Sequence, residues 1–182
     1  TNVTGSSDLN PIGAQLDLIM QFVPNAKTIG TIYNSSEINS QFQVEILKKE
    51  LARYNVTLVE GTVSSVNDVQ QVAQGLIGKI DALYVPTDNI IASAMPVLTK
   101  ITTPAKVPVI TGEEGPLHGG GLAPVGVDYY ELGKIAGNMG ADILEGKSKP
   151  ADMPIQYQKE FKVKVNEPVL KTLGLQLPEA LK

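Results

Sequence analysis

The chain has 182 residues, of which 42% are hydrophobic and 19% are charged, and its formal net charge is -4. This composition is typical of a globular α/β protein and excludes a disordered, fibrous or membrane-embedded chain. A negative net charge without a concentrated basic patch argues against nucleic acid as a partner. The chain has no cysteine, which excludes disulfides, thiol catalysis and cysteine-ligated zinc within these residues.

Hydrophobic periodicity predicts helices and strands that alternate along the chain. Asn10 followed by a proline predicts a helix N-cap and an amphipathic helix that ends at Pro24. The elements expected next are a strand at 28–33, a helix at 38–54, a strand at 56–59, a helix at 67–76, a strand at 81–85, a helix at 90–101 and a strand at 107–110. Pro96 inside the last helix predicts a kink or a restart there.

The C-terminal part continues the alternation. A strand is expected at 122–127, and Asp128 with Glu131 predicts the N-terminal cap of a helix over about 129–145. An edge strand at 161–165 and a short helix at 168–173 close the chain. Strands and helices that alternate at short spacing indicate βαβ units. The predicted fold class is therefore α/β, with a parallel sheet covered by helices on both faces.

Three of the predicted buried strands end in short polar clusters. In open α/β sheets, ligands bind beyond the carboxyl ends of the strands, so these clusters form the candidate binding site. Its residues are Asn34, Ser35, Ser36, Thr87, Asp88, Asn89, Glu113 and Glu114. Asp88 serves either to hold a cationic ligand group or to cap the following helix, and both readings stay open. The residues at 34–36 serve equally well as turn residues or as donors to a small molecule.

No catalytic, metal or cofactor template fits the sequence. Glu113 and Glu114 are neighbours in an extended segment and point to opposite sides, so a catalytic carboxylate pair is not expected. The only histidine, His118, lacks the partners of a catalytic triad or a zinc site. Gly146-Lys147-Ser148 lacks the spacing of a phosphate-binding loop. The sequence therefore predicts a binding protein without catalytic residues, metals or cofactors.

Several ordered motifs together point to a known family. They are Thr4-Gly5-Ser6-Ser7-Asp8, Tyr33-Asn34-Ser35-Ser36-Glu37, Tyr84-Val85-Pro86-Thr87-Asp88-Asn89, Gly112-Glu113-Glu114-Gly115 and the segment 126–133. The set resembles the solute-binding proteins of bacterial ABC importers, in the branch associated with tryptophan, tyrosine and related ligands. The resemblance covers nearly the whole chain.

The resemblance implies a type I periplasmic-binding fold, in which two α/β lobes joined by three crossing strands close on a ligand. Residues 1–121 would be the second lobe, 122–150 the strand and helix that finish the first lobe, and 151–182 a C-terminal return strand and helix. Most of the first lobe would lie outside this chain. The signal peptide and the lipid-anchoring cysteine of an extracytoplasmic lipoprotein would lie upstream. The segment 102–105 departs from the family pattern, so the preceding helix should end early.

The implied function is capture of a small ligand, an amino acid of aromatic or related type, for delivery to an ABC permease. Asp88 would pair with the ligand ammonium, and the donors to its carboxylate would be Asn34, Ser35, Ser36 and Thr87. Glu113, Glu114 and Asp128 are further polar candidates. Two rival functions stay open: the ligand-sensing domain of a transcription regulator, and a small α/β enzyme that uses Glu113 or Glu114.

A single lobe has two further consequences. A micromolar complex is worth about -8 kcal/mol, and half of that leaves a dissociation constant in the millimolar range. We therefore predict that this chain alone binds ligand weakly or not at all. The helix at 129–145 would expose an apolar stripe, which predicts a dimer, a segment exchange or repacking of this helix on the existing sheet.

Overall fold

The computed structural model describes residues 2–182, which divide into two compact units. Unit 1 comprises the residues up to Leu9 together with Val127–Lys162. Unit 2 comprises Asn10–Gly126 together with Val163–Lys182. The chain therefore passes between the units three times.

These units divide the chain at other positions than the predicted domains 1–121, 122–150 and 151–182. The predicted domains refer to the lobes of a larger fold, and they stay predictions. Thr1, the first residue of the first predicted domain, lies outside the described residues.

Unit 2 contains a parallel sheet of alternating βα elements. The sheet order is β3-β2-β4-β5-β6-β8, and the strand pairs from β3 to β6 are parallel. The elements are α1 (Ile12–Phe22), β2 (Thr28–Asn34), α2 (Ile38–Leu51), β3 (Thr57–Val63), α3 (Val69–Leu76), β4 (Ala82–Val85), α4 (Asn89–Thr102), β5 (Val109–Thr111), β6 (Ala123–Gly126) and α6 (Glu167–Leu173). The edge strand β8 (Lys162–Val163) spans a unit boundary. The predicted α/β class with a parallel sheet is confirmed.

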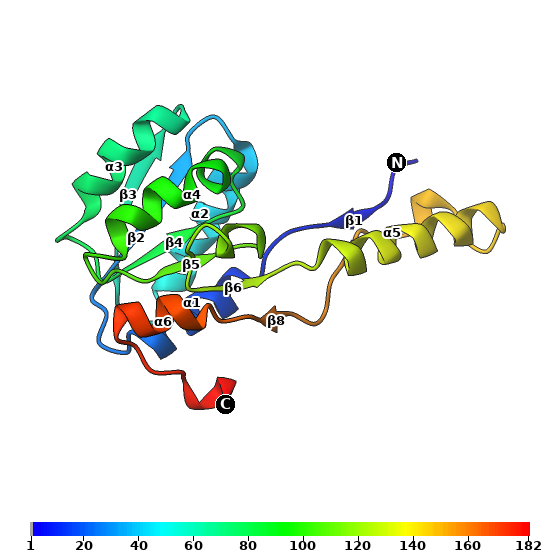
Figure 1. Ribbon diagram of the computed structural model, residues 1–182. Helices are drawn as coiled ribbons and strands as arrows, with labels where there is room; N and C mark the ends of the chain where they lie inside the picture. The colour runs from blue at the N-terminus through cyan, green and yellow to red at the C-terminus, as the bar shows by residue number, and fades with distance from the viewer. Residues whose placement is uncertain (1) are drawn as a thin grey trace. The chain divides into compact units, whose positions relative to one another are not determined.

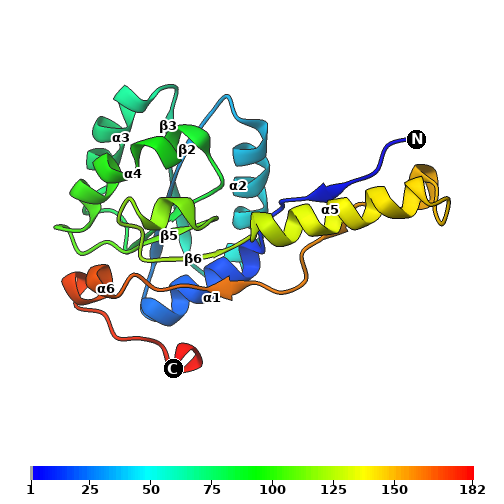
Figure 2. The same cartoon turned by 45° about the vertical axis from the view of Figure 1, so that its right-hand side comes forward.

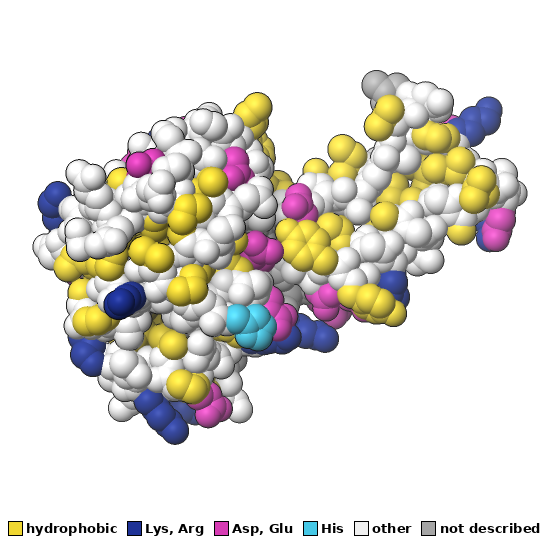
Figure 3. All heavy atoms as spheres, turned by 45° about the horizontal axis from the view of Figure 1, so that its top comes forward, with side chains coloured by type: hydrophobic (Ala, Val, Ile, Leu, Met, Phe, Trp, Pro, Cys, Tyr) yellow, Lys and Arg dark blue, Asp and Glu magenta, His cyan; other side chains and the backbone are white. Residues whose placement is uncertain are grey.

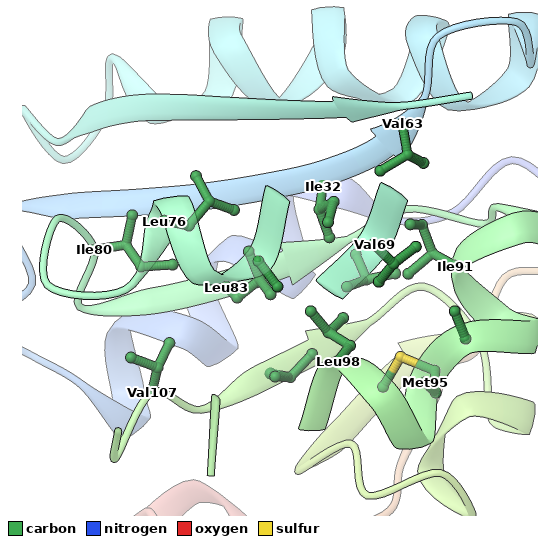
Figure 4. Close-up of a cluster of buried hydrophobic side chains, with 14 residues drawn as sticks. Ile32, Val63, Val69, Leu76, Ile80, Leu83, Ile91, Met95, Leu98 and Val107 are labelled. Carbon is green, nitrogen blue, oxygen red and sulfur yellow. The ribbon is translucent and has the colours of Figure 1, made fainter. Parts of the chain in front are cut away.

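Helices cover both faces of this sheet, α3 and α4 on one and α1 and α2 on the other (Figures 1 and 2). Successive strand residues point to opposite faces, so every second side chain enters the same core. Figure 4 shows Ile32 and Leu83 of the strands pointing toward Met95 and Leu98 of α4. Full burial of one such side chain contributes about 1.5–3 kcal/mol. This packing holds the strands, and therefore their ends, in fixed positions.

The strand register brings the predicted polar clusters to one edge. Thr31 of β2 lies opposite Tyr84 of β4, and Tyr84 lies opposite Ile110 of β5. Because the three strands are parallel, the segments that follow their carboxyl ends all leave the sheet at the same edge. The loops at 34–37, 86–89 and 112–114 are therefore neighbours in unit 2.

Two differences from the predicted elements are informative, one at β3 and one at α4. β3 continues to Val63, four residues beyond the prediction, because exposed Glu60 and Thr62 alternate with buried Gly61 and Val63. Such alternation is typical of a half-exposed strand, and β3 forms an edge of the sheet. α4 is one helix that contains Pro96, so the restart is wrong, whereas the alternative of a kink at Pro96 stays a prediction. The helix ends at Thr102, next to the segment 102–105, and an end earlier than in other family members stays a prediction.

Unit 1 is small and has few buried apolar side chains. It contains β1 (Ser6–Ser7), α5 (Tyr129–Leu144) and β7 (Gln156–Tyr157). β1 pairs in parallel with β7, and α5 packs against both strands. Leu132 and Met139 of α5 are buried, which covers part of the predicted apolar stripe. Along residues 2–182, no helix has both the length and the apolarity needed to cross a membrane.

Candidate functional site

Eight of the nine predicted site residues lie at or just beyond the carboxyl ends of β2, β4 and β5 in unit 2. They are Asn34, Ser35, Ser36, Thr87, Asp88, Asn89, Glu113 and Glu114. The ninth, Asp128, belongs to unit 1, where its carboxylate accepts hydrogen bonds from the backbone N–H groups of Tyr130 (3.0 Å) and Glu131 (3.3 Å). The predicted N-cap at Asp128 is confirmed.

Asp88 connects the two central loops of this edge. It is only 2% exposed, and its Oδ1 accepts a hydrogen bond from the Ile91 N–H (3.0 Å) at the start of α4. Its Oδ2 accepts from the Asn34 N–H (2.7 Å) and from the Ser40 hydroxyl (2.8 Å). The N-cap reading of Asp88 is confirmed. Three protein donors already bond to this carboxylate. The pairing of Asp88 with a ligand ammonium stays a prediction.

The loop after β2 forms a turn that exposes two serines. The Asn34 Oδ1 accepts a hydrogen bond from the Ser36 N–H (2.9 Å), and its Nδ2 donates to the Glu37 Oε1 (3.4 Å). An asparagine that bonds to the backbone two residues ahead is a common turn device. Asn34 is buried, whereas Ser35 and Ser36 are exposed. Residues 34–36 were predicted to serve as turn residues or as donors to a small molecule. Asn34 forms the turn, whereas the two serines lie at the surface.

Glu37 ties this turn to the loop after β4. Its Oε2 accepts hydrogen bonds from the backbone N–H (3.2 Å) and the side-chain Nδ2 (3.0 Å) of Asn89. Burial raises the pKa of Glu37, but the hydrogen bonds from Asn89 and Asn34 outweigh it and hold that pKa below its ordinary value. Glu37 was not among the predicted site residues. Its only signal in the sequence is its place in the polar cluster after β2.

Thr87 is held by residues that are far away in the sequence. Its hydroxyl oxygen accepts a hydrogen bond from the Asn10 Nδ2 (2.5 Å), and its backbone N–H donates to the Gln43 Oε1 (3.1 Å). The prediction that Asn10 caps the first helix is wrong, because α1 begins at Ile12 and has no side-chain cap. Asn10 is instead a buried partner of Thr87, and Gln43 lies on α2. Sequence reasoning missed both as site residues.

The segment after β5 supplies the predicted carboxylates. Glu114 is exposed and forms an ion pair with the Lys164 Nζ, whereas Glu113 is half-buried. The Gly112 N–H donates to the Val85 carbonyl (3.0 Å), which continues the pairing of β5 with β4. Within residues 2–182, no group of three or more histidine, aspartate or glutamate side chains is placed to hold a metal ion. His118 is exposed and is coloured cyan in Figure 3.

This edge of unit 2 suits a small molecule with a carboxylate. The N-terminus of α2 has no side-chain cap, so its first-turn N–H groups and the positive end of its dipole favour an anion. The exposed side chains of Ser35, Ser36 and Asn89 add hydrogen-bond donors nearby in the same two loops. The arrangement can bind and orient such a molecule.

The comparison with known families decides the identity. All of residues 1–182 match the sequence model of the family described as ABC transporter substrate binding protein. The chain belongs to this family. The predicted resemblance is confirmed, and with it the type I periplasmic-binding fold.

Relatives of this ABC substrate-binding chain carry informative names. A tyrosine-binding protein from Clostridioides difficile is 43% identical over 175 residues, covering 96% of this chain and 50% of that protein. The ligand-free, open structure of CD0873, a substrate-binding protein with adhesive properties from Clostridium difficile, is 44% identical with a TM-score of 0.83, covering 98% of this chain and 60% of that one.

A third relative was solved with a ligand. The ABC domain in complex with L-Trp from Streptococcus pneumonia is 37% identical to this chain with a TM-score of 0.88, covering 99% of this chain and 61% of that one. The chain spans about half the length of the curated relatives it matches.

Proposed function

We propose that this chain captures an aromatic amino acid for an ABC importer, with unit 2 supplying one wall of the binding cleft. One observation carries the proposal: in a substrate-binding chain, Asp88 and Glu37 fix two loops that present donors at the carboxyl edge of the sheet. The named tyrosine-binding relative and the relative solved with L-Trp support the ligand class.

The ligand carboxylate would lie at the N-terminus of α2. Ser35 and Ser36 would donate to it, together with the first-turn N–H groups of the helix. Thr87 would add a third hydroxyl, since its oxygen already accepts from Asn10 and its own proton is left to donate. The ammonium would be held by Glu113 and by the remaining acceptor site of Asp88, since a carboxylate accepts up to about four hydrogen bonds and protein donors supply three of them.

The wider role follows from the family. ABC substrate-binding proteins are periplasmic or extracytoplasmic and deliver their ligand to a permease. We extend that role, with a lipid anchor, to the full-length form of this protein. The binding role is not catalytic. The rival reading as a small enzyme is disfavoured because Glu114, one of its two carboxylates, is engaged with Lys164. Family membership disfavours the transcription regulator.

The test is an NMR titration of the 15N-labelled chain with millimolar L-tryptophan. We expect concentration-dependent amide shifts at residues 35–36 and 87–89. Tryptamine lacks the carboxylate and should leave the amides of residues 35–36 unmoved, whereas indole-3-propionate lacks the ammonium and should still move them. Absence of L-tryptophan shifts at this edge would overturn the proposal.

A pair of serine variants tests the predicted contact. Ser36→Ala removes a proposed donor to the ligand, and the loss of one hydrogen bond should weaken binding by roughly 2-fold to 10-fold. Ser64→Ala makes the same change at another exposed serine and should leave binding unchanged. Equal affinity of the two variants would remove Ser36 from the site.

A further inference from the structure

Two of the residues at which the chain enters or leaves unit 2 lie close together within that unit. Asn10 is the first residue of unit 2, and Gly126 is the last residue before the chain enters unit 1. Both lie against Gly112, in the loop after β5. A Cβ atom built on Gly126 would lie 2.0 Å from the Gly112 carbonyl oxygen, and one built on Gly112 would lie 2.9 Å from the Asn10 Nδ2.

Thr87 completes this contact. The Cβ atom built on Gly112 would also lie 3.1 Å from the Thr87 N and Oγ1 atoms. Asn10, Thr87, Gly112 and Gly126 therefore pack without spare space, and we call these four residues the boundary node. A close-packed interior transmits displacement, since no gap absorbs it. A movement of Thr87 toward this node therefore displaces Asn10 or Gly112.

The hydrogen bonds fix the orientation of the Asn10 amide. The Thr87 N–H donates to the Gln43 Oε1 (3.1 Å), so the oxygen of the Gln43 amide faces this place. Asn10 must then present its nitrogen to that oxygen (3.3 Å) as well as to the Thr87 hydroxyl. The Asn10 Oδ1 is buried without a hydrogen-bond partner among the described residues. Among residues 2–182, this amide is held by its two Nδ2 hydrogen bonds, and one of them is to Thr87.

We propose that Asn10 is a positioning residue that couples ligand contact at residues 87–89 to the two chain segments leaving unit 2 at Asn10 and Gly126. The inference rests on the proposed function, in which the Thr87 hydroxyl donates to the ligand carboxylate. A hydroxyl that donates becomes a stronger acceptor, because hydrogen bonds in a chain polarise one another. Ligand contact therefore tightens the bond from the Asn10 Nδ2 to Thr87.

The L-tryptophan titration tests this coupling in the unmodified chain. The amides of Thr87 and Asn89 should shift, and the Asn10 side-chain NH2 and the Gly126 and Val127 backbone amides should shift with the same concentration dependence. Shifts at Thr87 and Asn89 without shifts at the other three would overturn the inference and leave the proposed function standing. Absence of all shifts would overturn the proposed function and the inference with it.

Asn10→Asp separates coupling from a merely structural role. The aspartate keeps the shape of the side chain but has no N–H to donate to Thr87 or Gln43. In this variant the shifts at Gly126 and Val127 should fall at least fivefold relative to those at Thr87 and Asn89. Asn25→Asp makes the same change at an exposed position and should leave all shifts unchanged. Persistence of the Gly126 and Val127 shifts in folded Asn10→Asp would contradict the coupling.

Discussion

Unit 2 buries its apolar side chains between a sheet and helices on both faces, whereas the described part of unit 1 exposes more large apolar side chains than it buries. The buried apolar residues of unit 1 are Val127, Leu132 and Met139. Its exposed ones are Val3, Tyr129, Tyr130, Leu144, Ile155 and Tyr157, and hydrophobic side chains show at the surface in Figure 3. Unit 2 therefore has a hydrophobic core of its own, while unit 1 lacks a core of comparable size.

The largest expected effect concerns the same substitution in the two units. Leu98→Ala removes a fully buried side chain from the core of unit 2 and should lower the free energy of unfolding by about 2–5 kcal/mol. Leu144→Ala removes a side chain that is 89% exposed in unit 1 and should change it by less than about 0.5 kcal/mol. Urea unfolding followed by circular dichroism measures both. Similar losses would contradict the contrast between the units.

A glycine pair gives the next largest effect. Gly126→Ala forces a Cβ atom against the Gly112 backbone and should destabilise unit 2 by about 1–3 kcal/mol. Gly133→Ala on α5 meets open space and should stabilise its helix by roughly 0.5–1 kcal/mol. Thermal unfolding of the two variants compares them. If Gly126→Ala left the stability unchanged, the close packing of the boundary node would be contradicted.

Exposed apolar surface in unit 1 predicts self-association. Leu144→Lys should raise the dissociation constant of a dimer about tenfold, which corresponds to about 1.4 kcal/mol. Ile38→Lys, at a side chain of unit 2 that is 81% exposed, should leave association unchanged. Analytical ultracentrifugation over a range of concentrations measures both. A chain that stays monomeric throughout would rule out association through unit 1.

The smallest effect concerns the pH dependence of unit 2. The folded pKa of Glu37 lies below its ordinary value of about 4.3, so its contribution to stability is present above that pH. The contribution is lost as the pH falls through the folded pKa. Between about pH 5 and pH 3, the unfolding free energy should therefore fall more steeply in the wild type than in Glu37→Gln. Urea unfolding at several pH values measures the difference, and parallel curves would contradict it.

Local signals were enough to predict most of the fold of unit 2. The run 28–33 contains no charged residue and ends in a turn cluster, so it indicated a buried strand, which β2 (Thr28–Asn34) confirms. Asp88 stands directly before a helical pattern, which allowed its cap to be predicted. Such signals depend on residues within a few positions of one another.

The internal contacts of the candidate site could not be predicted in the same way. Asn10 bonds to Thr87, 77 residues away, and to Gln43, 33 residues away. Its position before a proline suggested a cap instead. The close approach of Gly126 to Gly112 depends on the pairing of β5 with β6. The spacing of residues in the sequence does not predict which strands pair. The sequence thus predicted which loops meet at this edge of the sheet, but not the contacts of Asn10, Gln43 and Gly112 that hold these loops.

Calorimetry of the 182-residue chain with L-tryptophan tests most directly whether unit 2 supplies one wall of a two-walled cleft. We expect weak binding, with a dissociation constant in the millimolar range, or about -4 kcal/mol. A micromolar dissociation constant would mean that this chain holds a complete site, and would contradict it.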